Sequence, residues 1–141
     1  MTIHGSCLCG KVRYEIDGAL GQVDHCHCTF CQKSHGAAFG SYAEVNPKTF
    51  RWIGAADTVG RYQSSSHSAR LFCRNCGSSL VAEIDGGKMM AVTLGTIDDI
   101  PALPKGFHMF VRSRAPWHEI NDDLPQYNEY PPSMSQFTPT A

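Results

Sequence analysis

The sequence lacks long apolar runs, a basic leader and any imbalance of charge. No segment approaches the ~20 apolar residues that a membrane-spanning helix needs, and the N-terminal residues have no basic flank leading into an apolar stretch. The 12 basic and 13 acidic residues give a formal net charge of -1, and neither sign forms a long block. These absences argue against a membrane or nucleic acid as partner and predict a cytoplasmic protein.

Patterns of a long amphipathic helix are also missing, whereas glycine (13) and proline (8) are frequent. Such a composition favours an all-β fold of short strands. The cleanest alternation places Val12, Tyr14 and Ile16 on one buried face, and Asp85-Gly86-Gly87 predicts a hairpin turn. A single helical turn is predicted at residues 29–34, and strands are predicted at residues 11–16, 22–26, 37–45, 49–53, 58–62, 69–73, 79–84, 88–94 and 107–111.

The length of 141 residues suits one domain, and no internal boundary or repeat appears. We predict a single domain over residues 1–130, followed by a flexible tail at residues 131–141, where apolar content is low. By default, the larger aromatic residues of the domain are interpreted as core, and Trp117 as a core residue, a lid or an anchor of the C-terminal segment. The core set is Phe39, Tyr42, Phe72 and Trp117. The sequence is compatible with a homo-oligomer.

Seven cysteines without a secretion signal indicate metal binding rather than disulfides, because the cytosol keeps thiols reduced and the number is odd. No cysteine stands alone. They occur as Cys7-x-Cys9, Cys26-x-Cys28-x-x-Cys31 and Cys73-x-x-Cys76.

Four of these cysteines can close one tetrahedral zinc site. Cys73-x-x-Cys76 followed by Gly77 has the form of a zinc knuckle and supplies two ligands. Cys7 and Cys9 form the other isolated pair, and side chains two apart in extended backbone point the same way. We therefore predict one structural zinc bound by Cys7, Cys9, Cys73 and Cys76.

This division leaves Cys26, Cys28 and Cys31 with three ligands and one open coordination position. A reactive zinc site keeps such a position open, whereas a structural site is closed. Other interpretations remain: Cys26 and Cys28 could join the knuckle, or the three thiols could be redox-active. A further interpretation is a closed second site, in which His25, His27 or His35 supplies the fourth ligand.

Three motifs carry a family resemblance, at residues 5–14, 25–33 and 72–80. The sequences around Cys7-Leu8-Cys9-Gly10, Cys26-His27-Cys28 and Cys73-Arg74-Asn75-Cys76 resemble the glutathione-dependent formaldehyde-activating enzyme family, as does the stretch at residues 108–127. Related domains include the centromere protein V type. The resemblance implies a β-tent fold of short antiparallel sheets around up to two zinc ions. It also implies a structural role for Cys7, Cys9, Cys73 and Cys76 and a catalytic role for Cys26, Cys28 and Cys31.

The activity implied by the resemblance is that of a carbon-sulfur lyase. We expect a zinc-dependent enzyme that adds a thiol such as glutathione to a small aldehyde such as formaldehyde, or the reverse. The alternative is a non-catalytic zinc module for protein interaction, with both metals structural. His108 is a candidate for proton transfer. Four cations are candidates for holding substrate carboxylates: Lys33, Arg70, Arg112 and Arg114.

Overall fold

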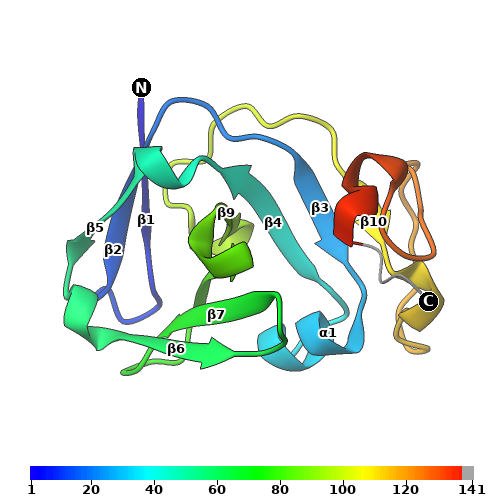
Figure 1. Cartoon of the computed structure of the whole chain (residues 1–141), viewed down its shortest axis with the longest axis horizontal. Helices are drawn as coiled ribbons and strands as arrows, with labels where there is room; N and C mark the ends of the chain where they lie inside the picture. Colours follow the sequence, from blue (N-terminus) through cyan, green and yellow to red (C-terminus); the bar gives the residue numbers. More distant parts are fainter. Residues whose placement is uncertain (138–141) are drawn as a thin grey trace. The chain divides into compact units, whose positions relative to one another are not determined.

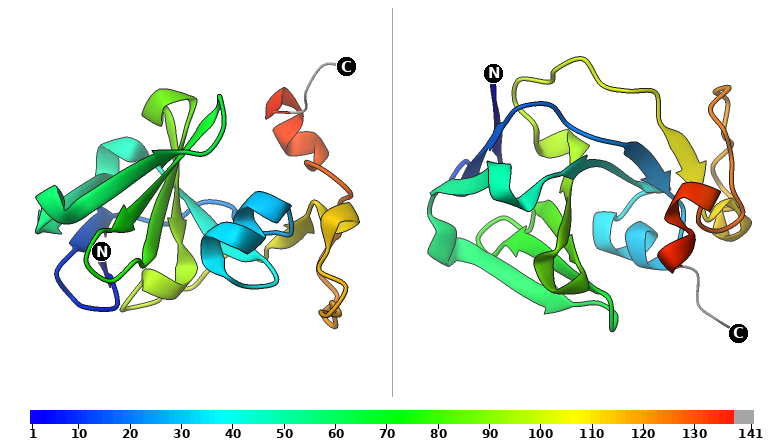
Figure 2. Two further views of the ribbon diagram at one scale, coloured as in Figure 1. Left: turned by 90° about the horizontal axis from the view of Figure 1, so that it is seen from below. Right: turned by 45° about the horizontal axis from the view of Figure 1, so that its top comes forward.

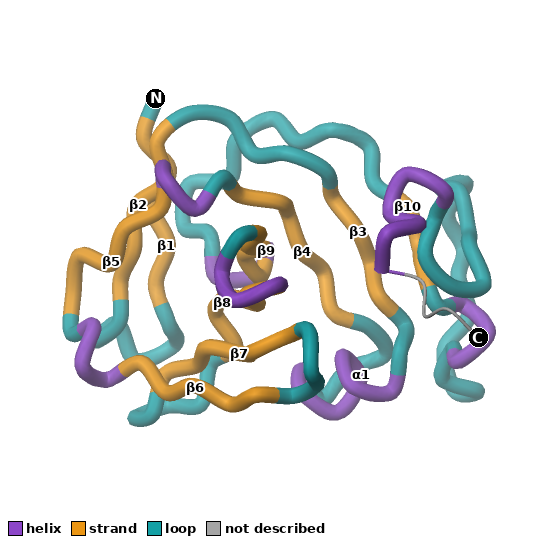
Figure 3. The backbone as a smooth tube through the Cα atoms, in the orientation of Figure 1, coloured by secondary structure: helices purple, strands orange, loops and turns teal. Residues whose placement is uncertain are grey.

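The computed structural model describes residues 1–137, and the chain divides into two compact units. Unit 1 comprises Met1–Gln22 and Tyr42–Pro104, and unit 2 begins with Val23–Ser41 and continues from Lys105. Across the described residues there are ten strands and a single α-helix, and the remaining helical turns are short 3-10 segments (Figure 3). The predicted all-β class is confirmed.

The first sheet of unit 1 has three antiparallel strands in the order β1-β2-β5 (Figure 1). The predicted buried face is confirmed, because Val12, Tyr14 and Ile16 are each 0% exposed. The ring of Tyr14 stacks on Phe50 and meets Trp52 edge-on, with centroids 5.2 and 6.2 Å away. These contacts fix β2 in the middle of the sheet. The strands are β1 (Thr2–Ser6), β2 (Arg13–Asp17) and β5 (Phe50–Gly54).

In the second sheet, five strands that lie in unit 1 apart from the first two residues of β4 follow the order β4-β9-β8-β7-β6, with every neighbouring pair antiparallel. Its later strands are the green ribbons of Figure 2. As predicted, the turn Asp85–Gly87 joins two paired strands, β8 and β9. The strands are β4 (Gly40–Val45), β6 (Val59–Gln63), β7 (Ser68–Cys73), β8 (Ser79–Ile84) and β9 (Met89–Thr93).

The strands on either side of residues 54–58 do not pair with each other. β5 pairs with β2, whereas β6 pairs with β7. Between them, Ala55 adopts a left-handed conformation (φ 47°) and Ala56–Thr58 forms a 3-10 turn. This kinked connection leads the chain from one sheet to the other, so the two strands predicted at residues 49–53 and 58–62 belong to different sheets.

Unit 2 contains β3 (Val23–Cys26), α1 (Thr29–His35) and β10 (Phe107–Met109). β10 runs parallel to β3 and lies beside it (Figure 1), so the sheets are not all antiparallel as expected. A parallel pair needs a long connection, which the residues between the two strands supply. The predicted helical turn is a helix of seven residues, closed by Gly36 in the left-handed conformation (φ 58°).

Two further predictions concern membrane insertion and the C-terminal tail. Among residues 1–137, no helix has the length and apolar character required to span a bilayer. The segment predicted as a flexible tail, residues 131–141, includes the 3-10 helix Pro132–Phe137. Residues 138–141 of this predicted tail lie outside the described residues.

Candidate functional site

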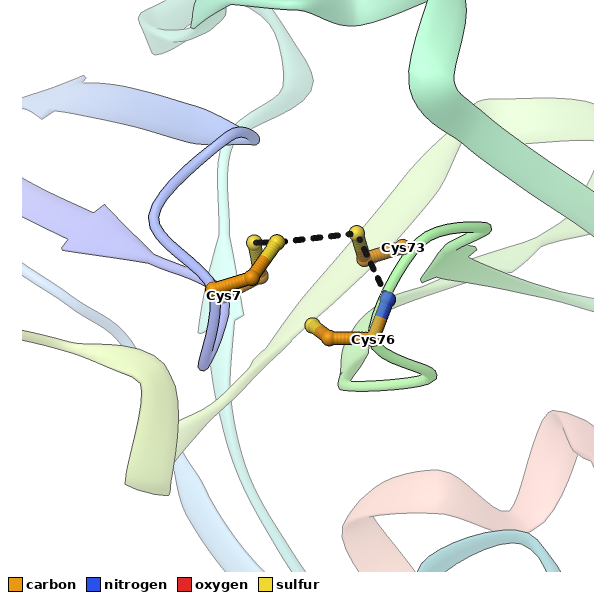
Figure 4. A group of neighbouring side chains, drawn as sticks. Cys7, Cys73 and Cys76 are labelled. Carbon is orange, nitrogen blue, oxygen red and sulfur yellow. Dashed lines mark hydrogen bonds between the residues drawn. The ribbon is translucent and has the colours of Figure 1, made fainter.

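Unit 1 brings Cys7, Cys9, Cys73 and Cys76 together, with all four sulfur atoms within 4.8 Å of one another. Figure 4 shows the side chains of Cys7, Cys73 and Cys76 pointing toward one another. The Cys7 and Cys9 sulfurs are 3.5 Å apart, and those of Cys9 and Cys73 are 3.9 Å apart. Tetrahedral zinc with Zn–S bonds of about 2.3 Å requires sulfur atoms about 3.8 Å apart. The cluster therefore fits a zinc ion in both donor type and spacing.

The turn between β1 and β2 presents the first two thiols. The Cys7 N–H donates to the Val12 carbonyl at 3.0 Å, and the Val12 N–H donates to the Cys7 sulfur at 3.3 Å. Gly10 closes the turn at φ 78° and donates to the Cys7 carbonyl. A left-handed backbone favours glycine at this position, which explains the Cys9-Gly10 pair in the sequence.

The knuckle after β7 presents the other two thiols. The Cys76 N–H donates to the Cys73 sulfur at 3.4 Å, and the Gly77 N–H donates to the Cys73 carbonyl at 2.8 Å. Ser78 links the two halves of the cluster, because its hydroxyl accepts from the Leu8 N–H at 2.8 Å and lies 3.3 Å from the Cys76 sulfur. The four thiols are therefore positioned by backbone hydrogen bonds on both sides.

Local hydrogen bonds favour the thiolate form at the two less buried cysteines of this cluster, Cys9 and Cys76. The Ser78 hydroxyl, followed by its backbone, lowers the pKa of Cys76 to about 5. The Asn75 side chain likewise lowers the pKa of Cys9, whereas burial raises the pKa of Cys7. Thiolates are the metal-binding form of cysteine, so the lowered pKa values of Cys9 and Cys76 favour binding of a cation.

Unit 2 groups Cys26, Cys28 and Cys31, again with their sulfur atoms within 4.8 Å of one another. Cys26 ends β3, Cys28 is the N-cap of α1, and Cys31 lies in the first turn of that helix. Cys26 and Cys31 are 4% and 5% exposed. Within residues 1–137 this group consists of three thiols alone, and none of the candidate fourth ligands His25, His27 and His35 belongs to it.

The two Cys-x-x-Cys segments share one local geometry. The Cys31 N–H donates to the Cys28 sulfur at 3.4 Å, as the Cys76 N–H does to the Cys73 sulfur. In both segments, the backbone N–H of the second cysteine therefore donates to the sulfur of the cysteine three positions earlier. The two segments differ in how they continue: the segment from Cys28 to Cys31 runs on into α1, whereas Gly77, at φ 82°, ends the segment from Cys73 to Cys76.

Negative charge in the three-thiol group concentrates on Cys28. Hydrogen bonds from the Cys26 and Cys31 thiols lower the pKa of Cys28 far below its ordinary value, and the corresponding bond raises the pKa of Cys26. The pKa of Tyr130 is raised by burial and then by the charges of the three cysteines. A cation bound by the three thiols would replace these hydrogen bonds between sulfur atoms, because a metal binds cysteine as its thiolate.

A glutamine that sequence reasoning missed anchors the three-thiol segment. The Gln32 side-chain amide donates to the His27 carbonyl at 2.7 Å and to the Ser113 carbonyl at 2.9 Å. Gln32 follows Cys31 directly, but its long-range partner gives no local sequence signal. It holds the turn from β3 into α1 against the segment after β10.

The predicted proton-transfer residue, His108, is buried rather than open to solvent, with 2% of its surface exposed. Its Nδ1 lies 2.8 Å from the Nε2 of His27, and its Nε2 lies 2.9 Å from a carboxylate oxygen of Asp122. Sequence reasoning missed Asp122 because only the return of the C-terminal segment to β10 brings it to His108. His108 therefore belongs to a buried hydrogen-bonded network.

The four candidate cations divide between the units. Arg70 lies in unit 1 and donates to the Tyr42 hydroxyl at 3.1 Å, and Arg112 in unit 2 pairs with Glu129 at 2.5 Å. Lys33 and Arg114 also lie in unit 2, and both are exposed.

The core interpretation of the aromatic residues is only partly right. Tyr42 is buried, Phe39 and Phe72 are half-buried, and Trp117 is 70% exposed. The default placement of Trp117 in the core is wrong: it follows Pro116 in an irregular segment, and its only ring contact among the described residues is with His118.

The chain resembles proteins of one family over most of its length. The family model described as glutathione-dependent formaldehyde-activating enzyme matches residues 2–113. A protein of Halomonas elongata named for the same enzyme is 28% identical over 136 residues, covering 85% of this chain and 82% of that protein. A Schizosaccharomyces pombe protein named as an uncharacterized lyase is 29% identical over 84 residues. That match covers 60% of this chain and 59% of the lyase.

A solved structure supports the fold. The crystal structure of a Rhodobacter sphaeroides protein superposes with a TM-score of 0.57 at 22% sequence identity, covering 70% of this chain and 90% of that one. At this identity the likeness concerns the fold alone.

Proposed function

Because this chain belongs to the glutathione-dependent formaldehyde-activating enzyme family, we propose that it catalyses addition of a thiol such as glutathione to a small aldehyde such as formaldehyde, or the reverse. The family and the lyase name of a relative support a formaldehyde-activating, lyase-type function. The observation that carries the finer proposal is the group of three thiols, Cys26, Cys28 and Cys31, without a fourth protein ligand among residues 1–137.

The two cysteine groups suit two different metal roles. Cys7, Cys9, Cys73 and Cys76 would hold a structural zinc, because four thiolates close its coordination. Cys26, Cys28 and Cys31 would hold a second zinc, which supplies a Lewis acid for a thiol or an aldehyde oxygen when bound. Three thiolates leave one coordination position for such a substrate atom.

The reaction is a redox-neutral addition. A bond forms between the thiol sulfur and the aldehyde carbon, the carbon–oxygen π bond breaks, and the thiol proton ends on the oxygen. No oxidant or reductant is required. The residues around the three thiols must therefore orient the two substrates, hold the thiol as its anion and keep the segment from Cys26 to Cys31 in place.

Exposed side chains of unit 2 offer contacts for a carboxylate-bearing thiol. Lys33 lies on α1, two residues beyond Cys31, and Arg114 follows Ser113, the residue that Gln32 binds. Both are exposed, whereas the carboxylate of Glu129 already neutralises Arg112. We assign Lys33 and Arg114, rather than Arg112, to the carboxylates of the substrate thiol.

The proposal is tested with zinc-loaded protein, glutathione and a panel of aldehydes that includes formaldehyde. We expect thiohemiacetal formation above the spontaneous rate, loss of that acceleration in Cys28→Ser, and a higher KM for glutathione in Arg114→Ala than in the matched variant Arg112→Ala. No acceleration with any aldehyde would reject the carbon-sulfur assignment. With two zinc ions still bound, that result would favour a non-catalytic interaction module.

A further inference from the structure

A buried row of hydrogen bonds, which we call the imidazole network, connects the carboxylate of Asp122 to the residue between two of the three thiols. His27 stands between Cys26 and Cys28 and is 0% exposed, and His108 is 2% exposed. The Nε2 of His27 lies 2.8 Å from the Nδ1 of His108, whose Nε2 lies 2.9 and 3.1 Å from the Asp122 carboxylate oxygens. Asp122 itself is partly exposed, so the network runs from the surface inward.

The carboxylate determines the direction of its own hydrogen bond, and a neutral His108 then determines the direction of the next one. An ionised carboxylate accepts only, and the bond from His108 keeps the pKa of Asp122 below its usual value. The Nε2 of His108 therefore carries hydrogen and donates. With one ring proton, His108 offers a lone pair at Nδ1, which accepts from the Nε2–H of His27. Both rings are thus held in the Nε2–H tautomer.

Among the residues that the structure describes, the inner end of the network has no hydrogen-bond partner. The Nδ1 of His27 is buried and unpaired, and in the tautomer set by Asp122 it bears a lone pair rather than a hydrogen. A desolvated, unpaired acceptor costs stability, so an array built for stability alone would satisfy it.

His27 is fixed by its backbone as well as by its ring. Its N–H donates to the Met109 carbonyl at 2.9 Å, and its carbonyl accepts from the Gln32 amide at 2.7 Å. Phe39 packs against the ring with centroids 4.8 Å apart. Since Cys26 and Cys28 flank this residue in the sequence, the orientation of their thiols depends on how firmly His27 is held.

We propose that Asp122, His108 and His27 are positioning residues for the metal and substrate chemistry of Cys26, Cys28 and Cys31. The network fixes the tautomer and orientation of His27, and through its backbone the directions of the two flanking thiols. Outer residues that orient ligands commonly change metal affinity about 10–100-fold when they are replaced. The inference rests on the proposed function for its purpose, but its test requires no turnover.

The test compares Asp122→Asn with Asp123→Asn in the full-length, zinc-loaded protein. Both variants remove one negative charge from neighbouring exposed positions, but only Asp122 contacts His108. An asparagine can donate as well as accept, so it no longer dictates the tautomer of His108. We expect nitrogen NMR to show His108 and His27 as Nε2–H tautomers in the wild type and Asp123→Asn, and as a mixture in Asp122→Asn.

The second readout is metal affinity, measured by competition with a chelator. In Asp122→Asn the more weakly bound zinc should lose about tenfold in affinity, while the tightly bound zinc and the urea midpoint match those of Asp123→Asn. Cobalt substitution should show altered thiolate charge-transfer bands only in Asp122→Asn.

Equal zinc affinities in the two variants, or unchanged tautomers in Asp122→Asn, would overturn the network's positioning role. These outcomes are independent of catalysis. A wild-type protein that accelerates no aldehyde addition would reject the proposed function and leave the network to be judged by its tautomers and metal affinity.

Discussion

Gly5 in β1 occupies a position where even one added methyl group has no room. A Cβ atom at Gly5 would lie 2.0 Å from Cζ and 2.2 Å from the hydroxyl oxygen of Tyr14, its partner across the strand pair. Tyr14 is 0% exposed, packs on Phe50 and Trp52, and shares a 2.8 Å hydrogen bond with the Thr96 hydroxyl. Gly5→Ala must therefore displace a ring that is held on every side.

The expected cost combines two effects. Overpacking of a tight core costs about 1–3 kcal/mol, and loss of the Thr96 partner leaves a buried hydroxyl at a further cost of about 1–3 kcal/mol. We expect the free energy of unfolding to fall by about 2–6 kcal/mol in total. With a urea dependence of roughly 2 kcal/mol per molar, the midpoint should fall by roughly 1–3 M.

Urea unfolding of zinc-loaded protein measures this difference. Gly95→Ala is the matched control, because a Cβ there meets nothing within 4 Å, and we expect its midpoint to stay close to wild type. A double-mutant cycle isolates the contact: with Tyr14→Leu, which lacks the clashing ring atoms, Gly5→Ala should cost far less. An equal cost of Gly5→Ala in both backgrounds would refute the steric argument.

Two further predictions concern the thiols and one surface histidine. Cys73→Ser should lose soluble protein, because a closed zinc site contributes on the order of 10 kcal/mol to folding, whereas Cys28→Ser should stay folded and lose activity; soluble yield and circular dichroism decide, and equal insolubility of both variants would contradict an open second site. The bond to Asp99 raises the pKa of His4 above 6.5, so its stabilisation is fully present below pH 6.5 and is lost as the pH rises through the folded value. In Asp99→Asn, proton NMR should show the pKa of His4 falling toward 6.5, and an unchanged value would disprove the coupling.

Local sequence patterns predicted the features that depend on neighbouring residues. The alternation of Val12, Tyr14 and Ile16 identified a buried strand face, and the Cys-x-x-Cys spacings identified segments that group their thiols. In both cases the required geometry repeats within a few residues. Backbone hydrogen bonds at Cys28 and Cys73 then produce the same turn without help from distant parts of the chain.

Features that depend on long-range contacts were missed. Asp122 reaches His108 only because the C-terminal segment returns to β10, where the Tyr127 N–H donates to the His108 carbonyl at 2.9 Å. Trp117 is a large apolar residue of the kind found in cores, but it lies exposed, because apolar character alone does not determine burial. The parallel pairing of β10 with β3 likewise has no signal in either strand, because it depends on the long connection between them.

The count of zinc ions before and after mild chelation tests the division of the seven cysteines most directly. The closed group of Cys7, Cys9, Cys73 and Cys76 and the open group of Cys26, Cys28 and Cys31 predict two zinc ions per chain. A chelator should then remove one ion while circular dichroism stays that of the folded protein. Two ions that leave only together, on unfolding, would contradict an open and exchangeable second site.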